Sequence, residues 1–179
     1  MKPWDEIDLG RTLVGGTPYT ETLKQMEEVF CRGMLLGYPT GDPSNAIHPH
    51  RYKSGWKEYD YSAHPFWLFD EWCSFTGRTW IMLLNEGIPP TEMLWIMHYE
   101  GWYEKETIPL LKLALATQYR GGFYGGRGPY IFTHPNHLGL VYRNSVVGTF
   151  RQFTARDEIC NTKTGEKMGQ HICWGGMLV

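Results

Sequence analysis

The sequence predicts an α+β protein in which an antiparallel sheet or half-barrel is built from two repeated three-stranded units joined by a helix, with a further helix at the N-terminus. Two regions rich in aromatic and branched residues, 56–102 and 138–177, are broken by turn signals typical of strands. The leucine-rich run LLKLALA separates them. At 179 residues we expect a single domain over 1–179, divided into an N-terminal helix and loop (1–55), a first β repeat (56–102), a connecting helix (104–120) and a second β repeat (121–179).

The first helix is predicted to begin near Thr17, which can cap it, with Pro18 at the first helical position. Apolar residues then recur at steps of three or four, at Leu23, Met26, Phe30 and Met34. Gly37 and Pro39 end the helix. Residues 39–55, rich in Pro, Gly and Ser, are predicted to form a long loop, and loops of this length are often functional.

Three antiparallel strands are predicted between Trp56 and Trp102, with breaks at His64-Pro65, at Thr76-Gly77 and at 85–90. The connecting helix is predicted from about Glu104 to Tyr119, because strong helix formers fill it and Pro109 lies in its first turns. Gly121 and Gly122 follow it and suit a helix end.

The two β regions contain similar segments. FTGRTWI at 75–81 matches FTARDEI at 153–159, with an offset of 153 minus 75, or 78. Residues 95–101 then align with 170–176 at an offset of 75. With strand alternation, this alignment places Trp95, Met97 and Tyr99 on the core face of one strand, and Gln170, Ile172, Trp174 and Gly176 on the core face of its counterpart. It also makes His98 equivalent to Cys173.

These motifs resemble a bacterial family, the domain of unknown function numbered 5680, over about residues 56–179. The residues that carry the resemblance are Phe75, Gly77, Trp95, Met97, Tyr99 and Gly101, then Arg127-Gly128-Pro129, Tyr142, Asn144, Gly148, Phe153, Ile159 and Gly176. The sequence departs from the family pattern at Thr79 and Ala155, so a role for paired acids does not carry over. Members of the family often look like the C-terminal part of helix-turn-helix regulators, which implies a sensing or ligand-binding module. The 55 or so residues before this region contain one good helix, too few for such a DNA-reading domain.

Composition argues against several classes of partner. The net charge is only −2, with both signs interspersed, so nucleic acid is not an expected partner. The N-terminal segment carries charges and no long apolar run, so we expect no membrane partner. The four cysteines show no CxxC spacing, which predicts buried reduced thiols and a cytoplasmic protein. A homo-oligomer stays open.

The stretch GGFYGGRGPYIF at 121–132 suggests two roles. Its glycines and Arg127 could cradle a phosphate. A nucleotide-hydrolase loop, however, needs a strand, GxxxxGK[ST] and then a helix, whereas here a helix precedes the glycines and a strand follows. We therefore favour a helix end and a turn into the second β unit, and expect that removing Arg127 would weaken anion binding but leave folding largely intact.

Catalytic and metal chemistry find little support in the sequence. The acid-base candidates are Asp70, Glu71, Glu100, Asp157 and Glu158, with His98 and His171 as partners. No serine or cysteine has a recognisable nucleophile motif. His48, His50, His134 and His137 occur as HPH and HPNH, which favours turn histidines over a metal site. We expect no metal, no cofactor and no catalytic residues, with a small hydrolase using a histidine and a carboxylate as an alternative.

Arginines beside aromatic residues suggest a binding cleft between the loops at 39–55 and 120–137, because guanidinium groups and rings together bind anionic aromatic ligands. The predicted function is a non-catalytic small-molecule-binding or sensing module, for a nucleotide-like or other anionic aromatic ligand. The predicted ligand-binding residues are Arg51, Tyr52, Trp56, Trp95, Tyr99, Arg120, Tyr124, Arg127 and Tyr142. A protein-interaction or host-defence-countering module is a further alternative, since the eight tryptophans suit interfaces.

Overall fold

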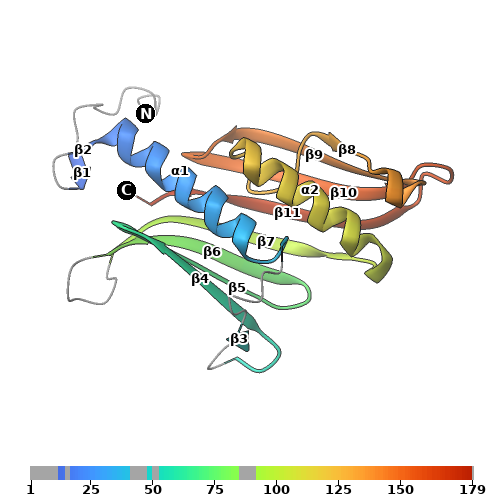
Figure 1. Ribbon diagram of the computed structural model, residues 1–179, viewed down its shortest axis with the longest axis horizontal. Helices are drawn as coiled ribbons and strands as arrows, with labels where there is room; N and C mark the ends of the chain where they lie inside the picture. The colour runs from blue at the N-terminus through green and yellow to red at the C-terminus, as the bar shows by residue number, and fades with distance from the viewer. Residues whose placement is uncertain (1–11, 15–16, 41–47, 50–52, 85–91, 179) are drawn as a thin grey trace, which may run out of the picture.

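The computed structural model describes residues 12–14, 17–40, 48–49, 53–84 and 92–178, and it confirms the α+β class. Within these described residues, one antiparallel sheet contains nine strands in the order β3-β4-β5-β6-β7-β11-β10-β9-β8. The two strands β1 (Thr12–Val14) and β2 (Thr17–Pro18) pair separately. Figure 1 shows both long helices crossing the sheet.

The elements of the main sheet follow one another as two meanders. The first comprises β3 (His48–Pro49), β4 (Lys57–Ala63), β5 (Phe66–Trp72), β6 (Thr76–Leu83) and β7 (Met93–Tyr103). The second comprises β8 (Ile131–Phe132), η3 (Pro135–His137), β9 (Leu140–Thr149), β10 (Gln152–Asn161) and β11 (Lys167–Met177). Because β7 pairs with β11, the last strand of each meander lies at the centre of the sheet.

The first meander contains four long strands, so the prediction of three between Trp56 and Trp102 is wrong. The turn at His64-Pro65 is short enough for β4 and β5 to pair along their whole length, from Lys57 opposite Trp72 to Ala63 opposite Phe66. The second meander has the three long strands predicted, preceded by the two-residue β8.

Helix α1 (Tyr19–Leu36) packs against β4, β5 and α2. Its buried stripe contains Met26, Phe30 and Met34, as the spacing of apolar residues predicted. The helix begins two residues after Thr17, because Thr17 and Pro18 pair with β1 and so belong to a strand. Gly37 and Pro39 lie just beyond its end.

Helix α2 (Ile108–Gly121) follows the short η2 turn (Lys105–Thr107) and connects the two meanders. Pro109 lies in its first turn, and Gly122, with a φ of 113°, lies at its end. Its inner face buries Leu110, Leu111, Ala114, Leu115 and Tyr119. In Figure 1 α2 lies beside α1, and the two helices cover the same face of the sheet.

The predicted faces of β11 are wrong by one residue. In the ladders, Gly77 pairs with Tyr99 and Ala155 pairs with Cys173. If FTGRTWI and FTARDEI are equivalent, the offset between β7 and β11 is therefore 173 minus 99, or 74, and not 75. A slip of one residue reverses every side chain.

The side chains of β11 show this reversal. Cys173 is fully buried and His171 faces the helices, whereas Ile172 and Trp174 are 43% and 39% exposed. His98 lies opposite Trp174 on the outer face, where the two rings stack with centroids 5.7 Å apart. His98 is thus not equivalent to Cys173.

The cysteines are unpaired thiols: Cys31, Cys160 and Cys173 are buried and Cys73 is half-buried. None of the helices described is long and apolar enough to cross a membrane.

Candidate functional site

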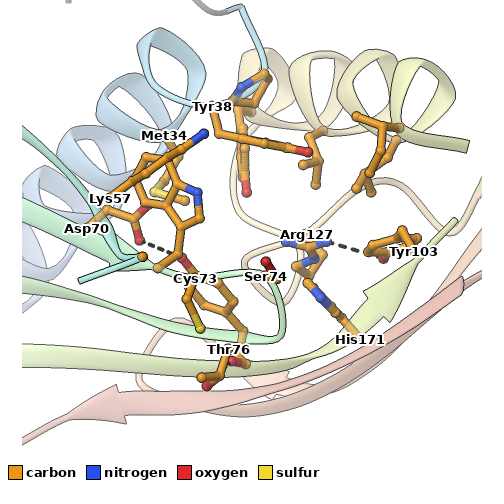
Figure 2. A pocket seen from close by; sticks show the side chains of 18 residues that line it. Met34, Tyr38, Lys57, Asp70, Cys73, Ser74, Thr76, Tyr103, Arg127 and His171 are labelled. Atoms are coloured by element: carbon orange, nitrogen blue, oxygen red, sulfur yellow. Dashed lines mark hydrogen bonds between the residues drawn. The ribbon is translucent and has the colours of Figure 1, made fainter. Parts of the chain in front are cut away.

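A cavity of about 280 Å³ lies between the inner face of the sheet and the two helices. Met34, Leu111 and Leu115 of the helices form its apolar side, and Tyr99 of β7 lines the sheet side. Figure 2 shows the polar groups at its two ends, with Asp70 on one side and Arg127, Tyr103 and His171 on the other. The cavity therefore combines apolar and aromatic walls with a few polar groups, as ligand sites commonly do.

Arg127 is positioned by the glycine-rich segment that follows α2. The backbone of this segment lies directly on the sheet: a Cβ at Gly125 would come within 2.6 Å of the Ala155 side chain, and one at Gly126 within 2.3 Å of Met97 Sδ. Both glycines also have left-handed φ angles, of 60° and 68°. The segment is thus a structural joint, as the sequence favoured, and it holds the Arg127 side chain between sheet and helices.

The Arg127 side chain forms a buried ion pair with Asp157 of β10. Its Nε donates to Asp157 Oδ2 at 2.7 Å, and its Nη2 donates to the Tyr103 hydroxyl at 3.2 Å. Arg127 is 6% exposed and Asp157 is fully buried. Burial alone would lower the pKa of the Arg127 guanidinium, but the charge of Asp157 outweighs it and raises this pKa well above its ordinary value.

Asp157 is saturated with hydrogen bonds. It also accepts from the Tyr142 hydroxyl at 2.8 Å, from the backbone N–H of His171 at 3.0 Å, and from the Tyr103 hydroxyl. Burial would raise its pKa, but the charge of Arg127 and these hydrogen bonds outweigh burial and hold the pKa below the ordinary value. Arg127 and Asp157 are consequently both charged at neutral pH.

Asp70 of β5 is the other buried aspartate and lies on the opposite side of the cavity (Figure 2). Its Oδ1 accepts from the Thr79 hydroxyl at 2.7 Å and from the Tyr99 hydroxyl at 3.0 Å. Burial raises its pKa to about 6, and the two hydrogen bonds and the more distant charge of Arg127 offset only part of that effect. Asp70 is therefore ionised at neutral pH but protonates in mild acid.

His171 of β11 presents a neutral imidazole to the cavity. Burial and the positive charge of Arg127 lower its pKa to about 3. Its ring lies against Tyr103, with centroids 4.8 Å apart. Its Nδ1 is buried and has no hydrogen-bond partner among the residues that the structure describes. A buried polar atom of this kind is rare in proteins.

The hydrolase alternative required a histidine side chain within hydrogen-bond reach of a carboxylate. Asp157 is bonded to the backbone of His171 and not to its imidazole. His98 lies on the outer face against Trp174. Over the described parts of the chain, no hydrogen bond joins an imidazole to a carboxylate, so the geometry offers no support for this alternative.

Only part of the predicted site comes together. Tyr99 and Arg127 line the cavity. Trp95 lies in the core instead, stacked on Phe150 with centroids 4.7 Å apart. Tyr142 is also fully buried, and its hydroxyl is occupied by Asp157 behind the cavity wall. Trp95 and Tyr142 therefore do not line this cavity, because Trp95 packs in the core and the Tyr142 hydroxyl donates to Asp157.

The remaining predicted residues lie elsewhere. Trp56 is half-buried under Lys53, whose Nζ lies 4.7 Å from the ring centre, and its neighbours Gly55 and Lys57 line the cavity in its place. The Tyr124 carbonyl accepts from Asn144, and Tyr124 does not line the cavity. Arg120 borders a separate hollow at the end of α2. Arg51 and Tyr52 lie outside the described residues.

The predicted site omitted Asp70, Tyr103, Tyr119 and His171, which all line the cavity. Asp70 carried a signal, because it continues the inward alternation of Phe66 and Leu68 along β5. Tyr103 likewise follows Met97, Tyr99 and Gly101 at steps of two. His171 was missed because the alignment placed it on the wrong face.

The histidine loops are described only in part. The ring of His134, which caps η3, and the ring of His137 have centroids 5.8 Å apart, and His134 Nδ1 accepts from the backbone of Asn136. The side chains of His48 and His50 lie outside the described part. Within that part, no group of three histidine, cysteine or acidic side chains is placed to hold a metal ion.

No protein-family model, curated protein sequence or solved structure matches this chain. The resemblance to family 5680 stays a prediction, and the proposals below depend on the geometry of the chain itself.

Proposed function

We propose that the protein is a binding or sensing module for a small anionic molecule with an apolar or aromatic body. The observation that carries the proposal is the side chain of Arg127, held on the wall of a cavity that is otherwise lined largely by aromatic and aliphatic side chains.

Arg127 retains donors for a ligand. A guanidinium has five N–H groups. One from Nε and one from Nη2 donate to Asp157 and Tyr103, and the other three have no partner among the described residues. Guanidinium donors bind carboxylate and phosphate oxygens strongly, especially away from bulk water. Lys57, which also lines the cavity, adds a second positive charge for the approach of an anion.

The size of the cavity limits the ligand. Ligand sites commonly enclose roughly 300–1,000 Å³, and about 280 Å³ lies just below that range. This volume favours an acid with a single ring over a complete nucleotide. The nucleotide-like ligand expected from the sequence is therefore tested beside single-ring acids.

The test is a thermal-shift and calorimetric screen with phenylacetate, other single-ring carboxylates and nucleoside monophosphates. A ligand that binds the folded state raises the melting temperature in proportion to its occupancy. We expect single-ring acids to raise it more than nucleotides do. No shift with any anion would contradict the proposal.

A pair of variants locates the binding. Ser74 is exposed at the β5–β6 turn and lines the cavity, so Ser74→Trp fills the entrance without disturbing the core. Ser62 is an exposed serine of β4 away from the cavity. We expect Ser74→Trp to abolish binding of phenylacetate and Ser62→Trp to preserve it. Equal binding by both variants would place the ligand elsewhere.

Arg127 itself needs a conservative change. Arg127→Ala would leave the buried carboxylate of Asp157 without its cation, so the expectation that folding stays largely intact does not agree with the geometry. Arg127→Lys keeps a positive charge near Asp157 but loses the forked donors. We expect it to weaken phenylacetate binding about tenfold or more, whereas Arg120→Ala, at the end of α2, leaves it unchanged.

The outer face of the sheet favours a second role, self-association. Trp102, Ile172 and Trp174 are 38%, 43% and 39% exposed there, and Phe69 and Trp80 form a further ring pair with centroids 5.0 Å apart. In a two-fold dimer the same patch occurs on both chains, so an aromatic face can complement itself. Light scattering should then show a dimer that Trp174→Asp dissociates and that Leu113→Asp does not, because Leu113 is an exposed residue of α2, which covers the other face of the sheet. A monomer at all concentrations would exclude this role.

A further inference from the structure

The cavity contains a hydrogen-bond acceptor at the end away from Arg127. Asp70 is 3% exposed and lines the cavity. The hydrogen bonds that it accepts from Thr79 and Tyr99 both end on Oδ1. Within the described residues, Oδ2 accepts no hydrogen bond. Oδ2 is also not fully enclosed, because it is absent from the enclosed side-chain atoms that have no hydrogen-bond partner. This oxygen is therefore free to accept from a bound molecule.

The opposite end of the cavity offers donors. Arg127 has N–H groups without a protein partner, as described above, and the neighbouring Tyr103 hydroxyl is already committed to Asp157. Figure 2 shows that Asp70 and Arg127 reach the cavity from different elements, β5 and the segment after α2. Tyr99 of β7 and Leu111 and Leu115 of α2 line the space in which a molecule would contact both. The Arg127 end is thus positively charged and donates hydrogen bonds, whereas the Asp70 end is negatively charged and accepts them.

We propose that the ligand is a bipolar single-ring acid, with its carboxylate on Arg127 and a hydroxyl or amino group donating to Asp70. This inference rests on the proposed function and adds the second recognition point. A ligand without a donor would exclude water from Asp70 and offer no hydrogen bond in its place. A site of this kind discriminates strongly against a ligand that lacks the donor.

The experiment compares four probes by isothermal titration calorimetry on the full chain: phenylacetate, 3-hydroxyphenylacetate, 4-hydroxyphenylacetate and 4-methoxyphenylacetate. The two hydroxy acids test both positions from which a donor can reach Asp70. The methoxy compound matches the size of the substituent but cannot donate. We expect one hydroxy acid to bind roughly tenfold tighter than phenylacetate, since it gains a hydrogen bond to a charged group, and the methoxy compound to bind no tighter than phenylacetate.

A variant assigns the preference to Asp70. Asp70→Asn keeps an oxygen for Thr79 and Tyr99 but presents an uncharged amide, so it should reduce the preference for the hydroxy acid over phenylacetate to about twofold or less. Asp60→Asn is the matched control, because Asp60 is an exposed carboxylate of β4 that accepts from Trp67 and does not line the cavity. The control should retain the full preference.

The outcomes separate this inference from the proposed function. If phenylacetate binds but neither hydroxy acid binds more than twofold tighter, the role of Asp70 is wrong and the anion site stands. If the preference survives in Asp70→Asn, the donor is recognised elsewhere and the inference is likewise overturned. If none of the four probes binds, both proposals fail.

Discussion

Asp157 and Asp70 are two buried aspartates on the inner face of the same sheet, yet the two halves of the molecule surround them very differently. Asp157 is paired with Arg127 and accepts further hydrogen bonds from Tyr103, Tyr142 and the backbone of His171. Asp70 accepts from two hydroxyl groups, both on one oxygen, and no cation among the described residues forms an ion pair with it.

The two carboxylates differ in how much hydrogen-bonding capacity they have left for a ligand. A buried carboxylate that is fully bonded has no capacity left, so Asp157 fixes Arg127 in place and does not itself bind anything. A buried carboxylate with an unused oxygen is costly to keep ionised, which is why the pKa of Asp70 is raised to about 6. Of the two aspartates, Asp70 is thus the one with hydrogen-bonding capacity left for a partner.

The largest effect is expected from breaking the saturated pair. Asp157→Asn removes the charge that compensates Arg127 and should lower the free energy of unfolding by about 3–5 kcal/mol, as for other buried ion pairs that lose one partner. Urea denaturation measures this. The adjacent Glu158→Gln, which affects the half-exposed pair with Lys167, should cost less than about 1 kcal/mol.

An equal loss of stability in Asp157→Asn and Glu158→Gln would contradict the importance given to the buried pair, because both variants remove one charge from the same strand.

The next prediction compares the loss of stability when each aspartate loses a tyrosine hydroxyl that donates to it. Tyr142→Phe removes a donor to Asp157 and leaves the backbone N–H of Gly128 without its acceptor, so we expect a loss of about 3 kcal/mol. Tyr99→Phe removes one of the two donors to Asp70 and should cost about 1.5 kcal/mol. Thermal and urea unfolding of the two variants side by side would rank them. The reverse order would show that Asp70, and not Asp157, is the more tightly integrated group.

A smaller effect with a distinct pH dependence is expected at Asp70. Its pKa is about 6 in the folded protein against an ordinary value of 3.8, so its contribution to stability is fully present below about pH 3.8 and is lost as the pH rises to about 6. Asp70→Asn does not titrate. The stability of Asp70→Asn relative to the wild type should therefore increase by about 2 kcal/mol between about pH 4 and pH 7.5.

His171 titrates in the opposite sense over part of this range. Its pKa is lowered to about 3 from an ordinary 6.5, so the stability that it contributes is lost as the pH falls from about 6.5 to about 3. That loss is common to the wild type and to Asp70→Asn and cancels in their difference. A difference between the two proteins that does not change with pH would show that Asp70 has an ordinary pKa.

Much of the fold could be predicted because the signals are local. The α1 stripe of Met26, Phe30 and Met34 and the boundaries of α2 follow from side-chain spacing, Pro109 and the glycines beyond. The pairing of β7 with β11 joins strands about 74 residues apart, and nothing local specifies it. The prediction of which β11 side chains point inward is wrong because Gly169, Gly175 and Gly176 weaken the alternation that fixes register.

The site was only partly predictable for a related reason. Arg127 was identified by its motif, but its partner Asp157 lies 30 residues away and is brought to it only by the register of β10 with β9 and β11. Trp95 and Tyr142 were assigned to a ligand because aromatic residues suit both cores and binding sites. Residue type alone does not separate these roles, whereas the position of each side chain relative to the cavity does.

In the proposed complex, the cavity holds a single-ring acid between Arg127 and Asp70. The decisive experiment is a crystal structure of the wild-type protein grown with the tighter-binding hydroxyphenylacetate isomer. We expect density in the cavity, with the carboxylate within hydrogen-bond distance of the Arg127 guanidinium and the hydroxyl on Asp70 Oδ2. An empty cavity at saturating ligand, or a ligand bound at another surface, would contradict it.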